Sequence, residues 1–295
     1  MTPQRIQGLV FSIAALLVAA ASFALTGFNQ QTELIVLAAL ILLLGVPHGA
    51  LDTIFARQLY SIHTLLGWAC FAGVYILLSF LVVGLWLLAP ILFLVLFLAI
   101  SLSHFSGDPA AGTPALSRIL YGGAIIFLPT LYHGPEVVRL FSFLVGMNAA
   151  SLLEPWLQIF AWPWLIALAV ASILSLRNNW LTAVEIISVG LLAALTPPLI
   201  SFTLFFCAMH SARHILRTLD YSGCSSPRLL LMGALFPMLG VLTASAATWY
   251  FFRSADLDAT VIRLIFVGLA ALTVPHMVLV ERVRFSGWIK GAVKR

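Results

Sequence analysis

Two histidines stand four residues apart in the stretch CAMHSARH, which ends an almost wholly apolar run of the sequence. His210 and His214 are expected to share one face of a helix, because residues at positions i and i+4 are neighbours there. Two imidazoles in this arrangement can bind one metal ion. An intramembrane zinc protease would need glutamate at the position of Ser211, and the chain has no His-x-x-His-His box of the kind found in membrane di-iron enzymes.

Three more histidines lie in apolar surroundings. His48 occurs in GVPHGALD, His104 in SLSHFSGD and His276 in TVPHMVLVE. The first two are each followed four residues later by an acid, Asp52 and Asp108. Because metal-bound histidines commonly donate their second ring N–H to a carboxylate, these acids are candidate partners of metal ligands. The alternative is that both acids only mark the water interface.

The composition indicates that these histidines lie in a membrane protein. The 295 residues are 62% hydrophobic and 8% charged, with a mean hydropathy of +1.09, whereas soluble domains carry roughly a quarter charged residues. No strict alternation over ten-residue segments is present to favour a membrane barrel. The net charge of +5 is explained by basic residues on the cytoplasmic side, so nucleic acid is not an expected partner.

The hydropathy pattern predicts an all-α fold, a polytopic transmembrane helical bundle of about ten spans. A span needs roughly 20 apolar residues, and proline ends or kinks a helix, so Pro90 and the sequence TPP at 196–198 divide two long apolar runs. The expected spans are 6–26, 34–51, 64–88, 91–107, 116–133, 157–176, 180–197, 199–217, 229–252 and 260–281.

The predicted spans form a single domain, residues 1–295. We expect helix 6–26 to be peripheral to a histidine-bearing core, 34–281, because all five buried histidines fall in the core. Residues 134–155 are too broken to span and are expected to form a re-entrant or surface segment on the outer side.

The distribution of Lys and Arg predicts the orientation. With the N-terminus in the cytoplasm, all of the fifteen Lys and Arg residues lie inside except Arg139, Arg253 and Arg263. Positive residues are concentrated in cytoplasmic loops, so we expect a multi-pass protein of the cell inner membrane with both termini cytoplasmic.

This topology brings the five histidines to one depth. Their four spans all run from outside to inside, and each histidine lies three to eight residues before the cytoplasmic end. Polar side chains in lipid are costly and usually functional, so a shared metal centre near the inner leaflet is expected. Glu185 is a third carboxylate at similar depth, which either hydrogen-bonds a ligand or snorkels. Arg213 is expected to point away from the metal toward the headgroups.

The donor set alone leaves several functions open. Imidazole ligation with open positions suits a mononuclear iron that activates O₂, and it is also compatible with zinc or copper. Facing histidines could instead hold a haem, in a protein with a structural or assembly role. Intramembrane histidines and acids also mark the ion pathways of transporters, although the chain lacks the internal repeat common in carriers.

The order of the motifs indicates one family. GVPHGALD, SHFSGD and HSARH, followed by TVPHMVLVE, resemble the motifs of the bacterial and archaeal Brp/Blh family of β-carotene 15,15′-dioxygenases. The resemblance covers residues 45 to 282. One departure is that Ser106 directly follows the phenylalanine of the second motif, where the family is expected to have glycine.

The resemblance implies an integral membrane oxidoreductase that uses non-haem Fe(II). It implies cleavage of the central double bond of β-carotene with O₂, giving two molecules of retinal, and a functional link to a retinal-binding rhodopsin. It assigns the iron to four histidines, and it leaves the two motif acids and the last histidine in roles outside the ligand set. The implied ligands are His48, His104, His210 and His214, and the outer residues are Asp52, Asp108 and His276.

Overall fold

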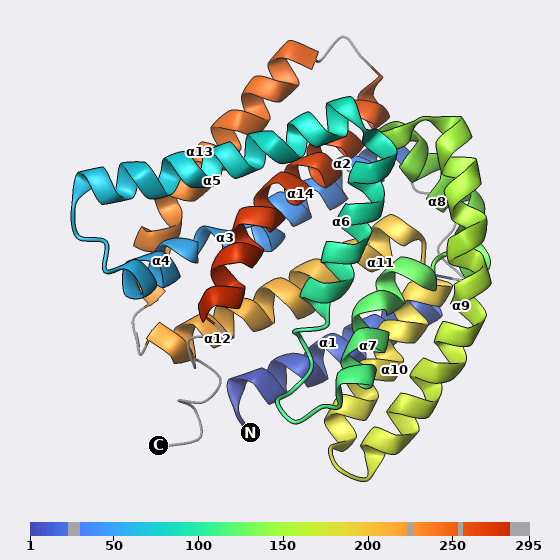
Figure 1. Ribbon diagram of the computed structural model, residues 1–295. Coiled ribbons are helices and arrows are strands. Elements are labelled where there is room, and N and C mark those ends of the chain that lie inside the picture. Colours follow the sequence, from blue (N-terminus) through green and yellow to red (C-terminus); the bar gives the residue numbers. More distant parts are fainter. Residues whose placement is uncertain (23–29, 223–226, 253–255, 284–295) are drawn as a thin grey trace. The chain divides into compact units, whose positions relative to one another are not determined.

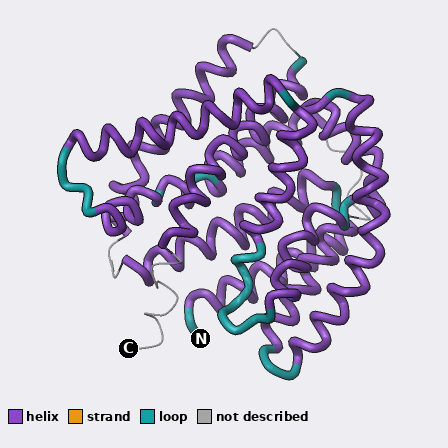
Figure 2. Tube along the Cα trace, in the orientation of Figure 1, coloured by secondary structure: helices purple, strands orange, loops and turns teal. Residues whose placement is uncertain are grey.

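The computed structural model describes residues 1–22, 30–222, 227–252 and 256–283, and Figure 1 shows their helices in chain order. Within these ranges the chain is helical with short connections and contains no strand, as Figure 2 shows. This confirms the predicted all-α fold. Arg253 and the basic residues of 284–295, on which the predicted orientation partly depends, lie outside the described residues.

Among the described residues, seven helices are long and apolar enough to cross a membrane. The consecutive helices α7 (Ala115–Phe127) and α8 (Thr130–Val145) would add an eighth span as one unit bent by 61°. Two apolar helices are shorter, α6 (Pro90–Phe105) and α10 (Trp180–Leu195). The seven are α1 (Pro3–Ala21), Gln31–Tyr60, α5 (Leu65–Leu88), α9 (Met147–Leu176), Pro198–Ser222, Gly233–Phe251 and Leu257–Arg282. The ten predicted spans therefore correspond to seven long helices, one bent pair and two shorter helices.

The two helix boundaries predicted at prolines are confirmed, and the expectation that residues 134–155 form a broken re-entrant or surface segment is wrong for residues 147–155. Pro90 begins α6 directly after α5, and α11 (Pro198–Leu204) begins in the TPP sequence after α10. Residues 147–155 do not form the expected broken segment, because α9 begins at Met147 and continues through Pro155 and Pro163. The break lies instead at Gly146, whose φ of 84° is a conformation that glycine adopts without strain.

The helices cluster into two compact units, each assembled from segments that are distant in the sequence. Unit 1 comprises Met1–Gly45 and Leu94–Arg213, and unit 2 comprises Val46–Phe93 and His214–Arg295. The histidine motifs are divided between them. His104 and His210 belong to unit 1, whereas His48, His214 and His276 belong to unit 2.

In unit 1, α10 packs against α1, α7, α8 and α9. Small residues allow these helices to approach closely, as is usual in membrane proteins. A Cβ at Gly190 would overlap the Leu168 side chain, and a Cβ at Gly123 would overlap the Trp164 ring. Trp164 also donates its indole N–H to the Leu120 carbonyl over 2.8 Å, which ties α9 to α7.

In unit 2, α14 (Leu257–Val283) packs against α3 (Pro47–Ala50), α4 (Asp52–Tyr60), α5 and α13 (Pro227–Phe252). The Ser79 hydroxyl of α5 donates to the Ala271 carbonyl of α14 over 2.9 Å. Hydrogen bonds of this kind connect helices where water is absent. Phe55, Ala56 and Leu279 form a buried core between α4 and α14.

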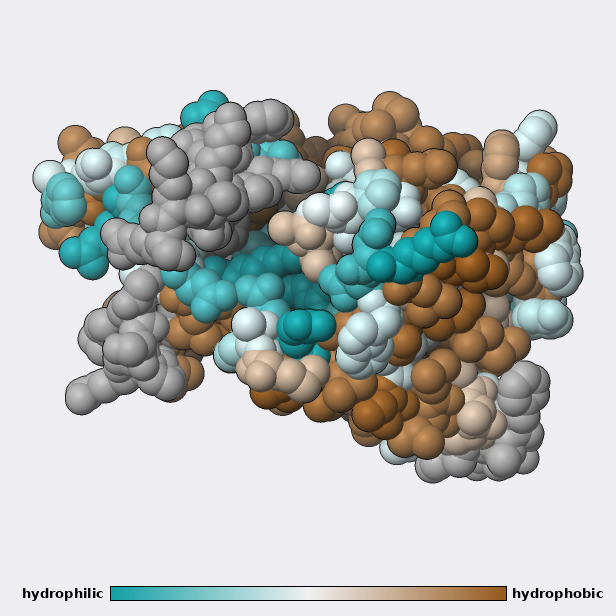
Figure 3. Space-filling view, turned by 90° about the horizontal axis from the view of Figure 1, so that it is seen from below, coloured by the Kyte–Doolittle hydropathy of each residue, from teal (hydrophilic) through white to brown (hydrophobic). Residues whose placement is uncertain are grey.

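The outer surfaces of both units are rich in large apolar side chains. On α5, Leu65 and Leu88 are 90% and 88% exposed. On α9, Leu152 and Trp156 are 71% and 66% exposed. Figure 3 shows hydrophobic side chains, in brown, over much of the visible face. Such surfaces are incompatible with a soluble monomer, so they are suited to contact with lipid.

Candidate metal centre

Two π-helical segments of unit 1, η1 (Ile41–Gly45) and η2 (Phe205–Ser211), pack against each other. Such turns are rare and occur frequently at functional sites. The Ser211 hydroxyl of η2 lies 2.7 Å from the Leu44 carbonyl and 3.0 Å from the Gly45 carbonyl, so it supplies a donor to the end of η1. η2 contains His210, and η1 ends at Gly45, the first residue of the motif of His48.

His210 is held by a carboxylate from another segment of unit 1. Its Nδ1 lies 3.0 Å from both carboxylate oxygens of Asp108, and both side chains are buried. An ionised carboxylate only accepts hydrogen bonds, so Nδ1 carries the proton and Nε2 is the nitrogen with which the ring can bind a metal. The His104 ring lies beside it, with a centroid distance of 4.4 Å.

Arg213 anchors a buried polar network in unit 1. Its guanidinium Nη2 donates to Glu185 Oε1 over 2.6 Å, and Nη1 donates to Glu185 Oε2 over 3.0 Å. The two residues therefore form a bidentate ion pair. Nη1 also lies 3.2 Å from the Asp108 carbonyl. Arg213 is only 4% exposed, so the expectation that it reaches the headgroups is wrong. It instead contacts the backbone of Asp108, whose carboxylate contacts His210.

The N-terminal helix α1 joins this network through Gln7. The side-chain carbonyl of Gln7 accepts a hydrogen bond from Arg213 Nε over 3.0 Å, and its NH₂ group donates to the Ala208 carbonyl of η2 over 2.7 Å. The next residue, Gly8, is buried against the ion pair, where a Cβ would overlap the carboxylate of Glu185. Gln7 therefore braces both η2 and Arg213.

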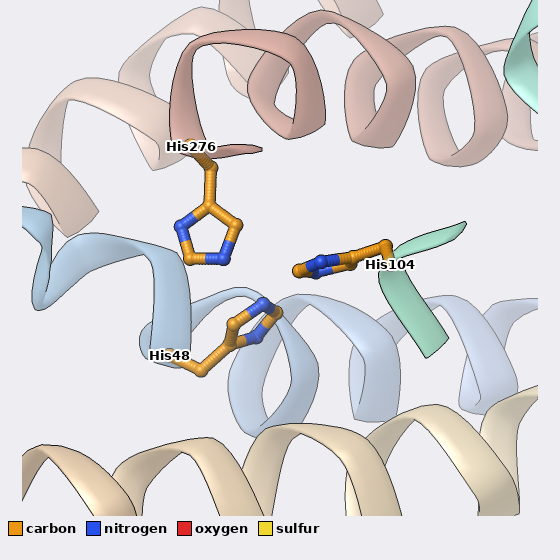
Figure 4. Close-up of side chains that lie close together, drawn as sticks. All are labelled: His48, His104 and His276. Carbon is orange, nitrogen blue, oxygen red and sulfur yellow. The ribbon is translucent and has the colours of Figure 1, made fainter. Parts of the chain in front are cut away.

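Three imidazoles gather in unit 2. The ring centroids of His48 and His214 lie 5.3 Å apart, those of His48 and His276 5.2 Å, and those of His214 and His276 5.0 Å. A ring nitrogen of His48 lies within 4.8 Å of one of His276. Figure 4 shows these two rings pointing toward each other from α3 and α14, and it also draws His104, which belongs to unit 1. His48, His214 and His276 are all buried.

His276 is held by a carboxylate. Its Nδ1 lies 2.7 Å from Asp52 Oδ1. The other oxygen, Oδ2, accepts a hydrogen bond from the Tyr75 hydroxyl over 3.1 Å, and this hydroxyl lies 3.3 Å from the Leu272 carbonyl. Asp52 is 2% exposed. Tyr75, Asp52 and His276 thus form a chain of hydrogen bonds across α5, α4 and α14.

Comparison with known proteins identifies the family. The family model described as Beta-carotene 15,15'-dioxygenase matches residues 39–283. The chain belongs to this family. The curated beta-carotene 15,15'-dioxygenase of an uncultured marine bacterium, 66A03, is 30% identical to it over 259 residues, covering 82% of this chain and 91% of that protein. No solved structure matches the chain. Membership in this family of carotenoid-cleaving dioxygenases confirms the resemblance seen in the motifs.

Both motif acids of this dioxygenase family member contact a histidine of another motif. Asp52 contacts His276, and Asp108 contacts His210. The alternative that both acids only mark the water interface is wrong, because both side chains are buried and each contacts an imidazole. The contact at Asp108 forms despite the serine after the phenylalanine in its motif.

Two residues of the polar networks were not singled out from the sequence. Tyr75 is one tyrosine in a long apolar helix, and Gln7 precedes residue 39, where the match to the dioxygenase family begins. The ion pair of Arg213 could have been predicted from the sequence, because a cation within a membrane helix requires a partner. Glu185, which was expected either to contact a ligand or to snorkel, is that partner.

Gly45→Ala is expected to destabilise the folded protein by about 1–3 kcal/mol, as overpacking does. A Cβ at this position of η1 would overlap the Phe206 ring, which is stacked on His210 with a centroid distance of 5.7 Å. Unfolding in mixed micelles measures the change. Gly84→Ala, where a Cβ meets nothing within 4 Å, is the matched control and is expected to leave stability unchanged or slightly raised. Equal stability of the two variants would contradict the close approach at Gly45.

Proposed function

We propose that this protein cleaves the central 15,15′ double bond of β-carotene with O₂ and releases two molecules of retinal. The observation that carries the proposal is the family match over residues 39–283, which includes the five histidines of the motifs, His48, His104, His210, His214 and His276. One O₂ supplies the oxygen atoms of both aldehydes, so the reaction balances without a further reductant.

The proposed cofactor is Fe(II), and the donors of the two units have the chemistry that it requires. Four neutral imidazoles are the proposed ligands, and their type suits a divalent first-row metal with open positions. The carboxylate on His210 Nδ1 supports the assignment, because such partners fix the tautomer and orientation of a ligand. When bound, the iron supplies the redox chemistry toward O₂. The proposed ligands are His48, His104, His210 and His214.

The residues of the chain then have defined tasks. Asp108 holds the proton at Nδ1 of His210, which keeps Nε2 for the metal. Glu185 and Arg213 fix the backbone beside Asp108. The phenylalanines Phe105 and Phe206 pack against His210 with ring centroids at 5.0 and 5.7 Å and help to exclude water. A dry, preorganised site of this kind favours chemistry on a hydrocarbon substrate.

The proposed setting is the cell inner membrane with both termini cytoplasmic, as the Lys and Arg distribution predicts. β-Carotene is a hydrocarbon that dissolves in the bilayer, so it would approach from the lipid. Retinal is similarly apolar, and a retinal-binding rhodopsin in the same membrane is a suitable recipient for the product.

The direct test is expression in cells that accumulate β-carotene. The expected result is loss of the orange colour together with formation of retinal, measured by chromatography, in proportion to the iron content of the purified protein. The comparison strain produces the His210→Ala variant at the same level. Retained colour with folded, iron-loaded protein would contradict cleavage of this substrate, and shortened products other than retinal would contradict cleavage at the central bond.

A further inference from the structure

Both units contain a histidine whose Nδ1 is held by a buried aspartate. In unit 1 the pair is His210 and Asp108 at 3.0 Å, and in unit 2 it is His276 and Asp52 at 2.7 Å. Both aspartates come four residues after another histidine, in the repeated pattern His-x-x-x-Asp. The second pair therefore has the same composition, burial and ring-nitrogen contact as the first.

Two imidazoles lie beside the ring of His276. His48 and His214 lie at 5.2 and 5.0 Å between ring centroids, and the three rings are nearly equidistant. Metal–nitrogen bonds are about 2.0–2.1 Å, so two nitrogens on one ion lie about 3–4 Å apart. The ring nitrogens of His48 and His276 are within 4.8 Å, which a small rotation of either ring would close to this range.

The contacts of His276 also select the nitrogen that faces the other rings. Asp52 accepts from Nδ1 and is itself fixed by the Tyr75 hydroxyl, so the neutral imidazole has its lone pair on Nε2. A histidine that only packs in a membrane core has no need of a buried carboxylate, whose burial is costly. A metal ligand does benefit from one, because the partner raises its basicity and fixes its direction.

We propose that His276 is itself a metal ligand, placed by Asp52 and Tyr75, and that it binds the ion together with His48 and His214. The inference rests on the proposed function only in that the chain binds a divalent metal. It adds a ligand to the four histidines proposed above. It also gives Asp52 and Tyr75 a role as positioning residues of this ligand.

The test is metal binding by purified, metal-free protein in nanodiscs. Fe(II) affinity is measured against a competing chelator, and Co(II) substitution gives a visible spectrum whose intensity reports the coordination number. His276→Ala is expected to weaken Fe(II) binding by more than about 100-fold and to change the Co(II) spectrum, whereas Asp52→Asn is expected to weaken it by roughly 10–100-fold, as loss of a ligand's carboxylate partner does. His63→Ala, which removes an exposed imidazole, is the control and keeps wild-type values.

Added imidazole separates a ligand from a packing residue. In His276→Ala it can occupy the space of the lost ring, and recovery of both metal affinity and the Co(II) spectrum supports ligation. His276→Gln, which keeps the side chain's bulk, should bind as weakly as the alanine variant. Wild-type affinity and spectrum in both variants, with only stability reduced, would overturn the role of His276 and leave the proposed function intact. Absence of Fe(II) binding by the wild type would overturn the iron centre and the role of His276 together.

Discussion

His210→Ala is expected to lose bound iron and retinal formation together. The side chain is 2% exposed, and its Nδ1 is held by Asp108, so the ring is fixed and Nε2 is the nitrogen proposed to bind the metal. Loss of an outer carboxylate partner alone weakens metal binding by roughly 10–100-fold, and loss of the ligand is expected to cost more. The variant also leaves Asp108 buried without its imidazole, so stability should fall as well.

Iron content per chain and retinal formation are the measurements for His210→Ala. Both are compared with His63→Ala, which removes an exposed histidine from the connection before α5 and should behave as the wild type. A folded His210→Ala protein that retains full iron and activity would remove this residue from the ligand set. Iron retained with activity lost would instead assign His210 to the reaction but not to iron binding.

Much of the fold could be predicted because prolines and apolar runs act locally. Pro90 and Pro198 begin helices where the sequence predicts them. The start of α9 at Met147 could not be predicted in this way, because Pro155 and Pro163 lie inside the helix, where packing against α8, α10 and α7 compensates for the missing backbone donors. The π-helical geometry of η1 and η2 likewise depends on tertiary contacts such as those of Ser211.

The acids of the site show where spacing fails as a guide. A spacing of four residues predicts one helix face only if the helix is continuous. Here α3 ends at Ala50 and α4 begins at Asp52, while α6 ends at Phe105 before Asp108 is reached. Each acid therefore does not have to share a helix face with the histidine of its own motif. Each contacts a histidine of another helix. The residue types were sufficient to predict a carboxylate–imidazole pair, but not its members.

The prediction that Arg213 reaches the headgroups is wrong for a related reason. The apolar helical segment Pro198–Ser222 continues beyond Arg213, and the side chain of Arg213 is buried. Glu185 also belongs to unit 1, and its carboxylate contacts the guanidinium and provides the opposite charge. A cation and an anion that are remote in sequence can be matched only when the packing of α10 against its neighbours is known.

Arg213→Met is expected to lower the free energy of unfolding by about 3–5 kcal/mol, since removal of one partner leaves a buried charge uncompensated. The Glu185 carboxylate would lose both of its guanidinium contacts, at 2.6 and 3.0 Å, and the Asp108 carbonyl and Gln7 would each lose a donor. Unfolding of metal-free protein in mixed micelles measures the change without any contribution from the metal. Arg139→Met, which removes a cation that lies 5.9 Å from the Phe143 ring centroid, is the control and should cost at most about 1 kcal/mol.

The double variant Glu185→Met/Arg213→Met separates the ion pair from the rest of the network. Replacing both charges removes the uncompensated carboxylate, and such replacements are often neutral or stabilising. The Asp108 carbonyl and Gln7 still lack their donor, so the double variant should remain about 1–3 kcal/mol below the wild type. It should nevertheless be more stable than Arg213→Met, because its effects are not additive. Additive losses would show that Arg213 stabilises unit 1 through the carbonyl of Asp108 and through Gln7, with no coupling to Glu185.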